Sequence, residues 1–122
     1  MSENNPFPNS EYKQFEFSKS DMTGTKFNGV NLTDSYFWAI LKNAKFSDSN
    51  LESCIFDDVD LFNSTYENVN LSHSTFNNIN MSNTLLTNIS LENSEINNAN
   101  LIGTKINGVL VSDLFEAYEK NS

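Results

Sequence analysis

The sequence predicts a solenoid in which the chain turns after every five residues, followed by a short helix. Every fifth residue from Leu41 to Val111 is apolar. A small or β-branched residue stands two positions before each of them, and Asn, Asp or Gly stands two positions after all but two. These apolar residues, here called the centres, are Leu41, Phe46, Leu51, Phe56, Leu61, Tyr66, Leu71, Phe76, Met81, Leu86, Leu91, Ile96, Leu101, Ile106 and Val111.

A five-residue period fits neither a helix nor a strand, because one buried face requires apolar spacing of about 3.6 or 2 residues. The chain must therefore bend in every repeat. Asn, Asp and Gly are the residues that best tolerate tight turns. If each repeat forms one side of a square coil, the centre and the small residue two before it point inward, and four repeats complete one coil.

The pattern resembles the pentapeptide-repeat family, whose motif is roughly Ala-(Asp/Asn)-Leu-X-X. Val59-Asp60-Leu61-Phe62-Asn63 and Ala99-Asn100-Leu101-Ile102-Gly103 match it directly. The resemblance implies an all-β fold, a right-handed quadrilateral β-helix of about five coils, with a short C-terminal α-helix.

The 122 residues are expected to form one domain with three parts. Residues 1–11 form an N-terminal arm, in which Phe7 stands between two prolines and could cover the open end of the solenoid. Residues 12–111 form the β-helix, and residues 112–122 form a capping helix and tail.

The period starts at Tyr12 and shifts once. Centres recur five apart from Tyr12 to Phe37, but the next centre is Leu41, so one residue is missing. We expect a tightened corner near Trp38 to Ile40. Counting this shift, the aromatic centres fall on two opposite sides of the coil and leucine or methionine on the other two, so the rings should stack as a core.

The last segment changes period after Val111. Asp113 could cap a helix with Glu116 three residues later, and an apolar face follows from Leu114, Phe115 and Tyr118. Such a short helix must dock on something. Two interpretations stay open: a lid over the last coil, and a dimerisation element of the kind found in some family members.

The sequence predicts no catalytic residue, no cofactor and no metal site, and hence a protein that is not an enzyme. The one histidine, His73, stands at an outward turn position, and Cys54 occupies an inward position suited to packing. The N-terminus lacks a basic and apolar leader, and no apolar run approaches a membrane span, so a cytoplasmic protein with no membrane contact is expected.

One candidate surface is acidic. The chain between Phe46 and Thr104 carries eight acidic residues and no Lys or Arg, among them Asp57, Asp58, Asp60 and Glu67. Some family members are acidic rods that mimic DNA and bind a type II topoisomerase such as gyrase, so the resemblance raises this hypothesis. Against it, about 24 Å of duplex carries roughly 14 charges, whereas this chain has a net charge of −9 spread over four sides. Direct nucleic-acid binding is not expected.

A second candidate surface is apolar and consists of Tyr36, Trp38, Ile40, Ile55 and Phe62, all at outward positions. Together they would form a patch for an unknown protein partner. The alternative is that the register shift tucks Trp38 against its neighbours. The preferred hypothesis is a rigid, non-enzymatic interaction scaffold, with acidic DNA mimicry as the alternative.

Overall fold

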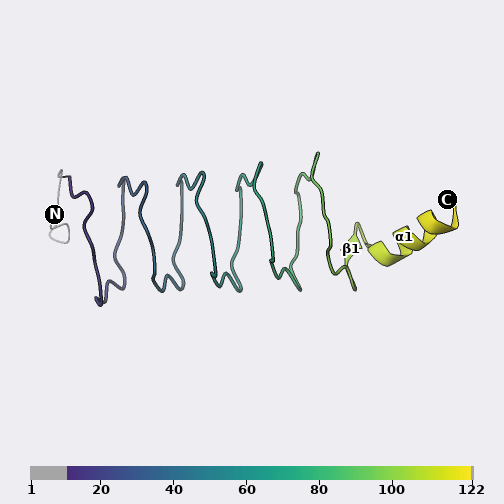
Figure 1. Ribbon diagram of the computed structural model, residues 1–122, viewed down its shortest axis with the longest axis horizontal. Coiled ribbons are helices and arrows are strands. Elements are labelled where there is room, and N and C mark those ends of the chain that lie inside the picture. The colour runs from purple at the N-terminus through teal and green to yellow at the C-terminus, as the bar shows by residue number, and fades with distance from the viewer. Residues whose placement is uncertain (1–10, 122) are drawn as a thin grey trace. The chain divides into compact units, whose positions relative to one another are not determined.

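The computed structural model describes residues 11–121 and divides the chain into two units, Met1–Asp60 and Leu61–Ser122. Each unit is described by itself. In both, the chain turns back on itself at regular intervals (Figure 1). The expected N-terminal arm lies almost entirely outside the described residues.

The residue two positions after each centre, here called the corner residue, has a left-handed backbone. From Gln14 to Gly103 every corner residue has a positive φ, with Ala39 as the exception. The values run from 50° at Asp48 to 78° at Gly24. Asn, Asp and Gly pay the least for this conformation, which explains why they dominate the corner position. The expectation of a turn in every repeat is confirmed.

Two kinds of corner alternate along the chain. After Met22, Leu32 and the later leucine centres except Leu86, the corner is a hydrogen-bonded β-turn, in which the N–H three residues on donates to the centre's carbonyl, as from Ala44 to Leu41 at 3.0 Å. Met81 is also followed by a turn. A positive φ at the third residue is typical of a type II turn. After the other centres, from Phe17 to Ile96, the corner is a bend. Equivalent corners therefore recur after two repeats.

Where a β-turn follows a centre, the residue immediately before that centre stabilises the turn through its side chain. Oδ1 of Asn50, Asn80 and Asn100 accepts a hydrogen bond from the N–H two residues on, at 2.9 to 3.0 Å. Asp21 and Asn31 do the same, each at 3.0 Å. Asn and Asp are suited to this short link, which is an Asx-turn. The outward position before these centres is thus specified by a hydrogen bond.

Exposure separates inward from outward side chains as the sequence predicts. Centres from Tyr12 to Ile96 expose between 38% and 66% of their surface, and Val59 and Ile79, two positions before a centre, expose 53% and 55%. Apolar residues at outward positions expose at least 82%. The centres and their small partners therefore lie on the concave side of each turn.

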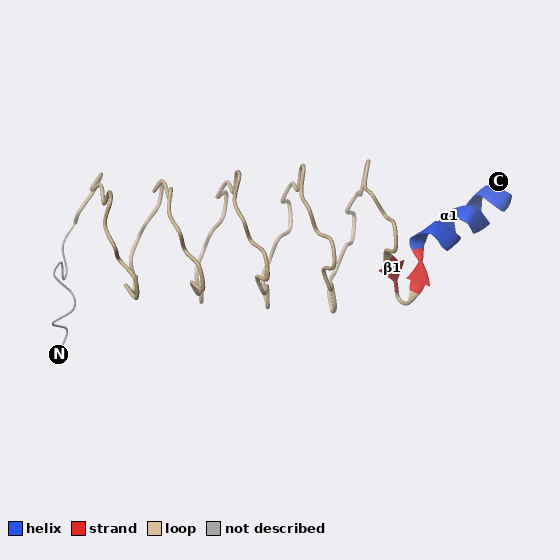
Figure 2. Ribbon diagram, turned by 90° about the horizontal axis from the view of Figure 1, so that it is seen from below, coloured by secondary structure: helices blue, strands red, loops and turns tan. Residues whose placement is uncertain are grey.

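The predicted packing between successive turns is not seen. Within each unit, no two described residues twelve or more apart have Cα atoms within 8 Å. Hydrogen-bonded strands would lie about 4.8 Å apart. The repeats accordingly contain no strand between residues 11 and 104 (Figure 2), and Val111, 6% exposed, is the single buried hydrophobic residue of the described chain. The described ring contacts are local, as between Phe15 and Phe17 at 5.3 Å.

The second unit ends in a hairpin and a helix. Strand β1 (Lys105–Ile106) pairs antiparallel with β2 (Val109–Leu110), and Ile106 lies opposite Val109. Asn107 and Gly108 join them with φ of 49° and 81°, as a type I′ turn requires. The Asn-Gly pair therefore turns the chain back between Ile106 and Val111, which stand five residues apart as the sequence pattern predicts.

Helix α1 (Val111–Lys120) begins three residues earlier than expected for an Asp113 cap. Leu110 occupies the N-cap position and makes no side-chain capping bond, so the predicted capping box is wrong. The backbone N–H of Val111 instead donates to the Thr104 carbonyl at 2.9 Å. Asp113 lies in the first turn and Lys120 in the last, where each favours the helix dipole.

Candidate interaction surfaces

The register shift alters one bend corner of the first unit. The corners after Phe17, Phe37 and Phe56 are equivalent bends. In the first and third, the corner residue has a positive φ, 52° at Lys19 and 53° at Asp58. Ala39 does not have a positive φ, and the next centre, Leu41, follows Phe37 after four residues instead of five. The corner near Trp38 to Ile40, where a tightened corner is expected, thus differs from its equivalents in backbone conformation.

This corner carries two large apolar side chains that face away from the turn. Trp38 and Ile40 are each 92% exposed, and Tyr36 just before the corner is 89% exposed. The alternative in which the shift tucks Trp38 against its neighbours is not what the structure shows. Ile55, also predicted for this surface, is 89% exposed on the following turn.

Ile40 also breaks a local rule of the repeat. Its position immediately precedes a β-turn centre, where Asp21 and Asn50 accept a hydrogen bond from the N–H two residues on. An isoleucine side chain has no acceptor for the N–H of Lys42. The turn from Leu41 to Ala44 therefore forms without the side-chain link that fastens its equivalents. Places where a sequence departs from its own local rule are often functional.

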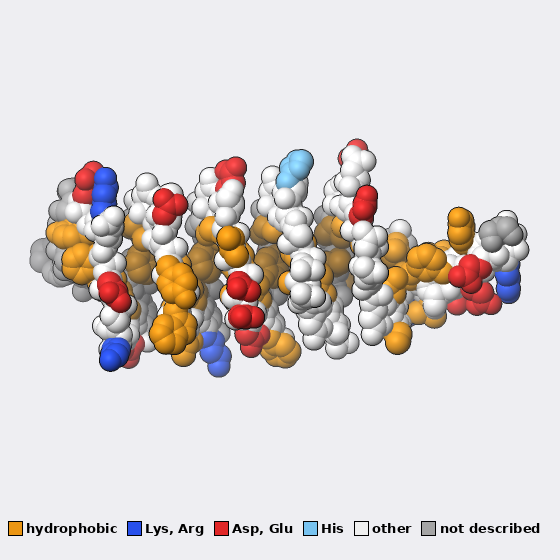
Figure 3. Space-filling model, viewed as in Figure 1, with side chains coloured by type: hydrophobic (Ala, Val, Ile, Leu, Met, Phe, Trp, Pro, Cys, Tyr) orange, Lys and Arg blue, Asp and Glu red, His pale blue; other side chains and the backbone are white. Residues whose placement is uncertain are grey.

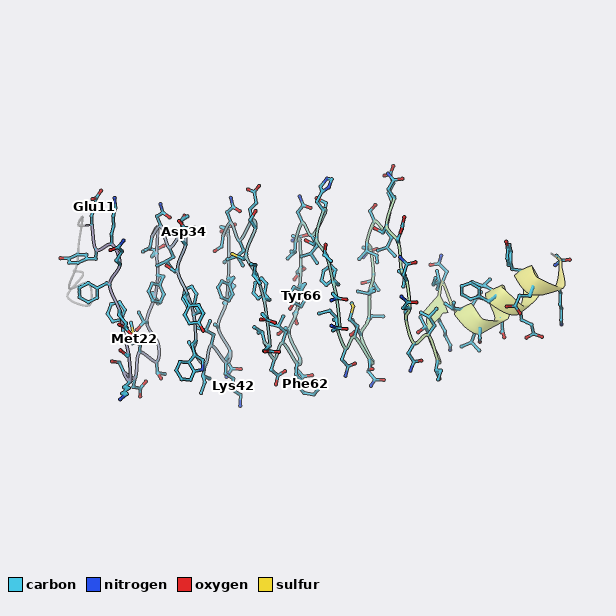
Figure 4. The ribbon with its side chains drawn as sticks, in the orientation of Figure 1. Glu11, Met22, Asp34, Lys42, Phe62 and Tyr66 are labelled. Atoms are coloured by element: carbon cyan, nitrogen blue, oxygen red, sulfur yellow. The ribbon has the colours of Figure 1, made fainter. Side chains whose placement is uncertain are left out.

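Phe62, the fifth predicted member of the apolar surface, belongs to the second unit. It is 82% exposed and occupies the second position of the β-turn from Leu61 to Ser64. Figure 4 shows its side chain at that corner, while Tyr66, 57% exposed, lies on the next side. Two further apolar residues of this unit that were not predicted, Leu85 and Ile102, are equally exposed, at 84% and 91%. Their outward positions in the five-residue register could have identified them.

Of the acidic candidates, Asp57, Asp58 and Asp60 belong to the first unit and Glu67 belongs to the second. Asp58 occupies a left-handed corner position and Asp60 the position before a β-turn centre, both of which select Asn or Asp. Asp57 stands in a bend, at a position where the repeat does not require a side-chain acceptor for a backbone N–H. In the second unit, Glu67 borders a polar hollow of about 360 Å³, together with residues 65, 66, 68, 87 and 88. Segments one coil apart therefore face one another across a gap.

The C-terminal candidates line an apolar hollow. Leu114, Phe115 and Tyr118 of α1 enclose about 360 Å³ with Ile106 and Val111. The three helix residues remain 47%, 55% and 73% exposed. The helix thus covers the final hairpin in part, and its apolar face is incompletely buried.

His73 and Cys54, the other two residues considered in the sequence, do not form a site with neighbouring side chains in the described part of the chain. His73 is a corner residue with a φ of 60°, and Cys54 is an exposed free thiol in the structure, which does not show the predicted packing. Hydrogen bonds from the hydroxyl and the N–H of Thr23 lower the pKa of Asp21 below its ordinary value. Across residues 11–121, no helix combines the length and the apolar character required to span a bilayer.

Comparison with protein families gives a match to pentapeptide repeats, with eight copies over residues 39–78 and 70–113. These segments cover more than half of the chain. The protein belongs to the pentapeptide-repeat family. The match begins at Ala39, at the corner where the register shifts. Comparisons with curated proteins and with solved structures found no match.

Proposed function

We propose that this pentapeptide-repeat protein is not an enzyme and works as a rigid scaffold that binds a partner protein. The observation that carries the proposal is the altered corner of the first unit. There Trp38 and Ile40 are almost fully exposed, and Ile40 replaces a residue that would fasten the turn. Exposed large apolar side chains gathered in one place are typical of protein-binding surfaces.

The rigidity of the scaffold rests on closure of the coils. Pentapeptide repeats in general form right-handed β-helices, and the concave side of each turn is lined by half-exposed apolar residues. Burying each large apolar side chain would contribute about 1.5–3 kcal/mol. The full fold is accordingly a right-handed quadrilateral β-helix of about five coils, with the centres inside. The left-handed corners and the Asx-turns support this proposal, because they turn the chain once in every repeat.

A second candidate function is acidic DNA mimicry toward a type II topoisomerase such as gyrase. The supporting observation is the stretch from Phe46 to Thr104, which carries eight acidic residues and no Lys or Arg. Three of these, Asp48, Asp58 and Asp60, stand where the backbone selects Asn or Asp in any case. That local explanation weakens the case for a surface built around charge.

The other expectations form part of the same proposal. The protein acts in the cytoplasm without a cofactor and without direct contact with membrane or nucleic acid. The incompletely buried face of α1 supports a role as a lid, and a homodimer through Leu114, Phe115 and Tyr118 is compatible with that role.

The test is affinity capture from cells that express the protein, followed by direct binding to the captured partner. Trp38→Ala with Ile40→Ala should abolish binding, while Ile102→Ala, which removes an equally exposed apolar side chain of the second unit, should leave it intact. Replacing Asp57, Asp58 and Asp60 by Asn tests mimicry. Loss of binding in that variant alone, to a topoisomerase, would favour the second function.

A further inference from the structure

We infer that the corner formed by Trp38 and Ile40 binds a basic, amphipathic segment of a partner protein, one that presents arginine or lysine beside an apolar side chain. This inference rests on the proposed scaffold function and specifies the chemistry of the partner. It combines the apolar patch and the acidic surface, which the sequence predicts as separate candidate surfaces, in one binding site.

The first step is the position of the apolar pair among equivalent corners of the first unit. Bend corners of the same kind lie one coil before it and one coil after it. The earlier corner carries Lys19 and Asp21, and the later one carries Asp57, Asp58 and Asp60. Figure 3 shows hydrophobic side chains flanked on the neighbouring turns by acidic ones. Three carboxylates therefore stand at the equivalent corner of the following turn, whose Cα atoms lie more than 8 Å from those of Trp38 and Ile40.

The second step is the local charge. Lys42 follows Ile40 by two residues, and Lys45 is the last cation before a stretch without Lys or Arg that runs to Thr104. In the first unit this stretch holds five acidic residues: Asp48, Glu52, Asp57, Asp58 and Asp60. The negative charge of the first unit is thus concentrated after Lys45, on the turn that follows Trp38.

The third step is the chemistry that suits both features. A guanidinium group stacks on the face of a tryptophan and pairs with carboxylates through a planar set of donors. Tryptophan and arginine are also the residues most enriched at the energetic centres of interfaces. A neutral apolar partner would desolvate the carboxylates without compensation, and an acidic partner would be repelled. Duplex DNA and anionic membranes carry the same sign of charge as the three carboxylates of the following turn.

The fourth step is that the charge can be removed without altering the backbone. Asp58 has a φ of 53°, a conformation that Asn also tolerates. Asp34 and Asp48 are corner residues of the same unit with φ of 63° and 50°, and they lie at other corners. Asp34→Asn with Asp48→Asn is therefore a control matched in net charge for Asp57→Asn with Asp58→Asn, and matched in backbone conformation for Asp58.

The experiment uses the full chain and three synthetic peptides of equal length, in which leucine alternates with arginine, glutamine or glutamate. Trp38 is the one tryptophan of the protein, so its fluorescence reports directly on this corner. The arginine peptide should bind, change the Trp38 emission and weaken steeply with salt. The Asp57→Asn, Asp58→Asn variant should bind it about tenfold more weakly, and the matched control by less than about twofold.

Several results would overturn the inference. The first is that the glutamine peptide binds as tightly as the arginine peptide. The second is that the Asp57→Asn, Asp58→Asn variant and its matched control lose the same affinity for the arginine peptide. The third is that the Trp38 emission changes with protein concentration when no peptide is present. The last result would assign the corner to a second copy of the chain. If the arginine peptide fails to bind while the Trp38→Ala, Ile40→Ala variant still loses its captured partner, the scaffold function stands and the basic partner is wrong. If the arginine peptide does not bind and the Trp38→Ala, Ile40→Ala variant keeps its captured partner, the scaffold function and the basic partner are both wrong.

Discussion

Oδ1 of Asn70 accepts two hydrogen bonds from Ser72, one from its N–H at 2.9 Å and one from its hydroxyl at 2.7 Å. The pair fastens the β-turn in which the N–H of Ser74 donates to the Leu71 carbonyl. We expect Asn70→Ala to reduce the free energy of unfolding by about 1 kcal/mol. Asn70→Asp keeps the acceptor and is the control. Urea unfolding measures both, and equal losses would show that the oxygen has no such role.

Leu71→Ala tests whether the coils close. Leu71 is 49% exposed on the concave side of its turn, and in a closed β-helix it would be buried. We expect this change to cost about 2–5 kcal/mol, because it would leave a cavity in a packed interior. A cost below that of Asn70→Ala in the same urea titration would mean that the turns stay apart.

Ile40→Asn should have opposite effects on stability and on binding. Asparagine at this position can accept the N–H of Lys42, as Asn50 accepts that of Glu52 at 2.9 Å. We expect the free energy of unfolding to rise by about 0.5–1.5 kcal/mol, while affinity for the partner falls.

Thermal unfolding and partner titration of the same Ile40→Asn preparation provide the two measurements. Ile40→Ala separates the contributions, since it removes the apolar group without adding an acceptor. A variant that is stabilised and still binds normally would exclude Ile40 from the interface.

Truncation after Val111 removes most of α1 and uncovers the hollow beside Ile106. Terminal repeats of solenoids need a cap, so we expect a lower melting temperature and aggregation. Size-exclusion chromatography with light scattering distinguishes the outcomes. A soluble monomer of unchanged stability would refute the lid, and a soluble monomer from a dimeric parent would assign α1 to dimerisation.

Asp21 should make stability depend on pH in the acid range. The Thr23 hydroxyl and N–H stabilise its charged form, which lowers its pKa in the folded chain below the ordinary value of 3.8. A carboxylate with a lowered pKa stabilises the fold above its unfolded pKa and loses this effect as pH falls through the folded value. The stability difference between wild type and Asp21→Asn should therefore shrink between pH 6 and pH 2. A constant difference would contradict the assignment.

Much of the local structure could be predicted from the sequence because the five-residue pattern encodes it directly. The inward centres, the left-handed corners and the irregular corner at Ala39 all follow from residue type and spacing. The alternation of β-turns and bends could not be predicted, because Asn occupies the corner position in both, as at Asn63 and Asn68. The hairpin was missed because Asn107-Gly108 also fits the repeat, although Asn-Gly is a strong hairpin signal.

For the candidate surfaces, the pattern predicted which apolar side chains face outward, Trp38 and Phe62 among them. Leu85 and Ile102 were overlooked although the same register identifies them. Packing between turns depends on contacts between residues about a coil apart, which periodicity implies but does not measure. The chemistry of a partner leaves still less trace in a single sequence.

The alternation of corners determines where the length of this chain can change at little cost. The missing residue falls at a bend, between the hydrogen-bonded turns that begin at Leu32 and Leu41, and both turns keep their backbone bonds at 3.1 and 3.0 Å. A deletion at a β-turn would have broken such a bond. Bends are therefore the sites at which evolution or an engineer could shorten the chain, or insert a binding loop, without disturbing the repeats on either side.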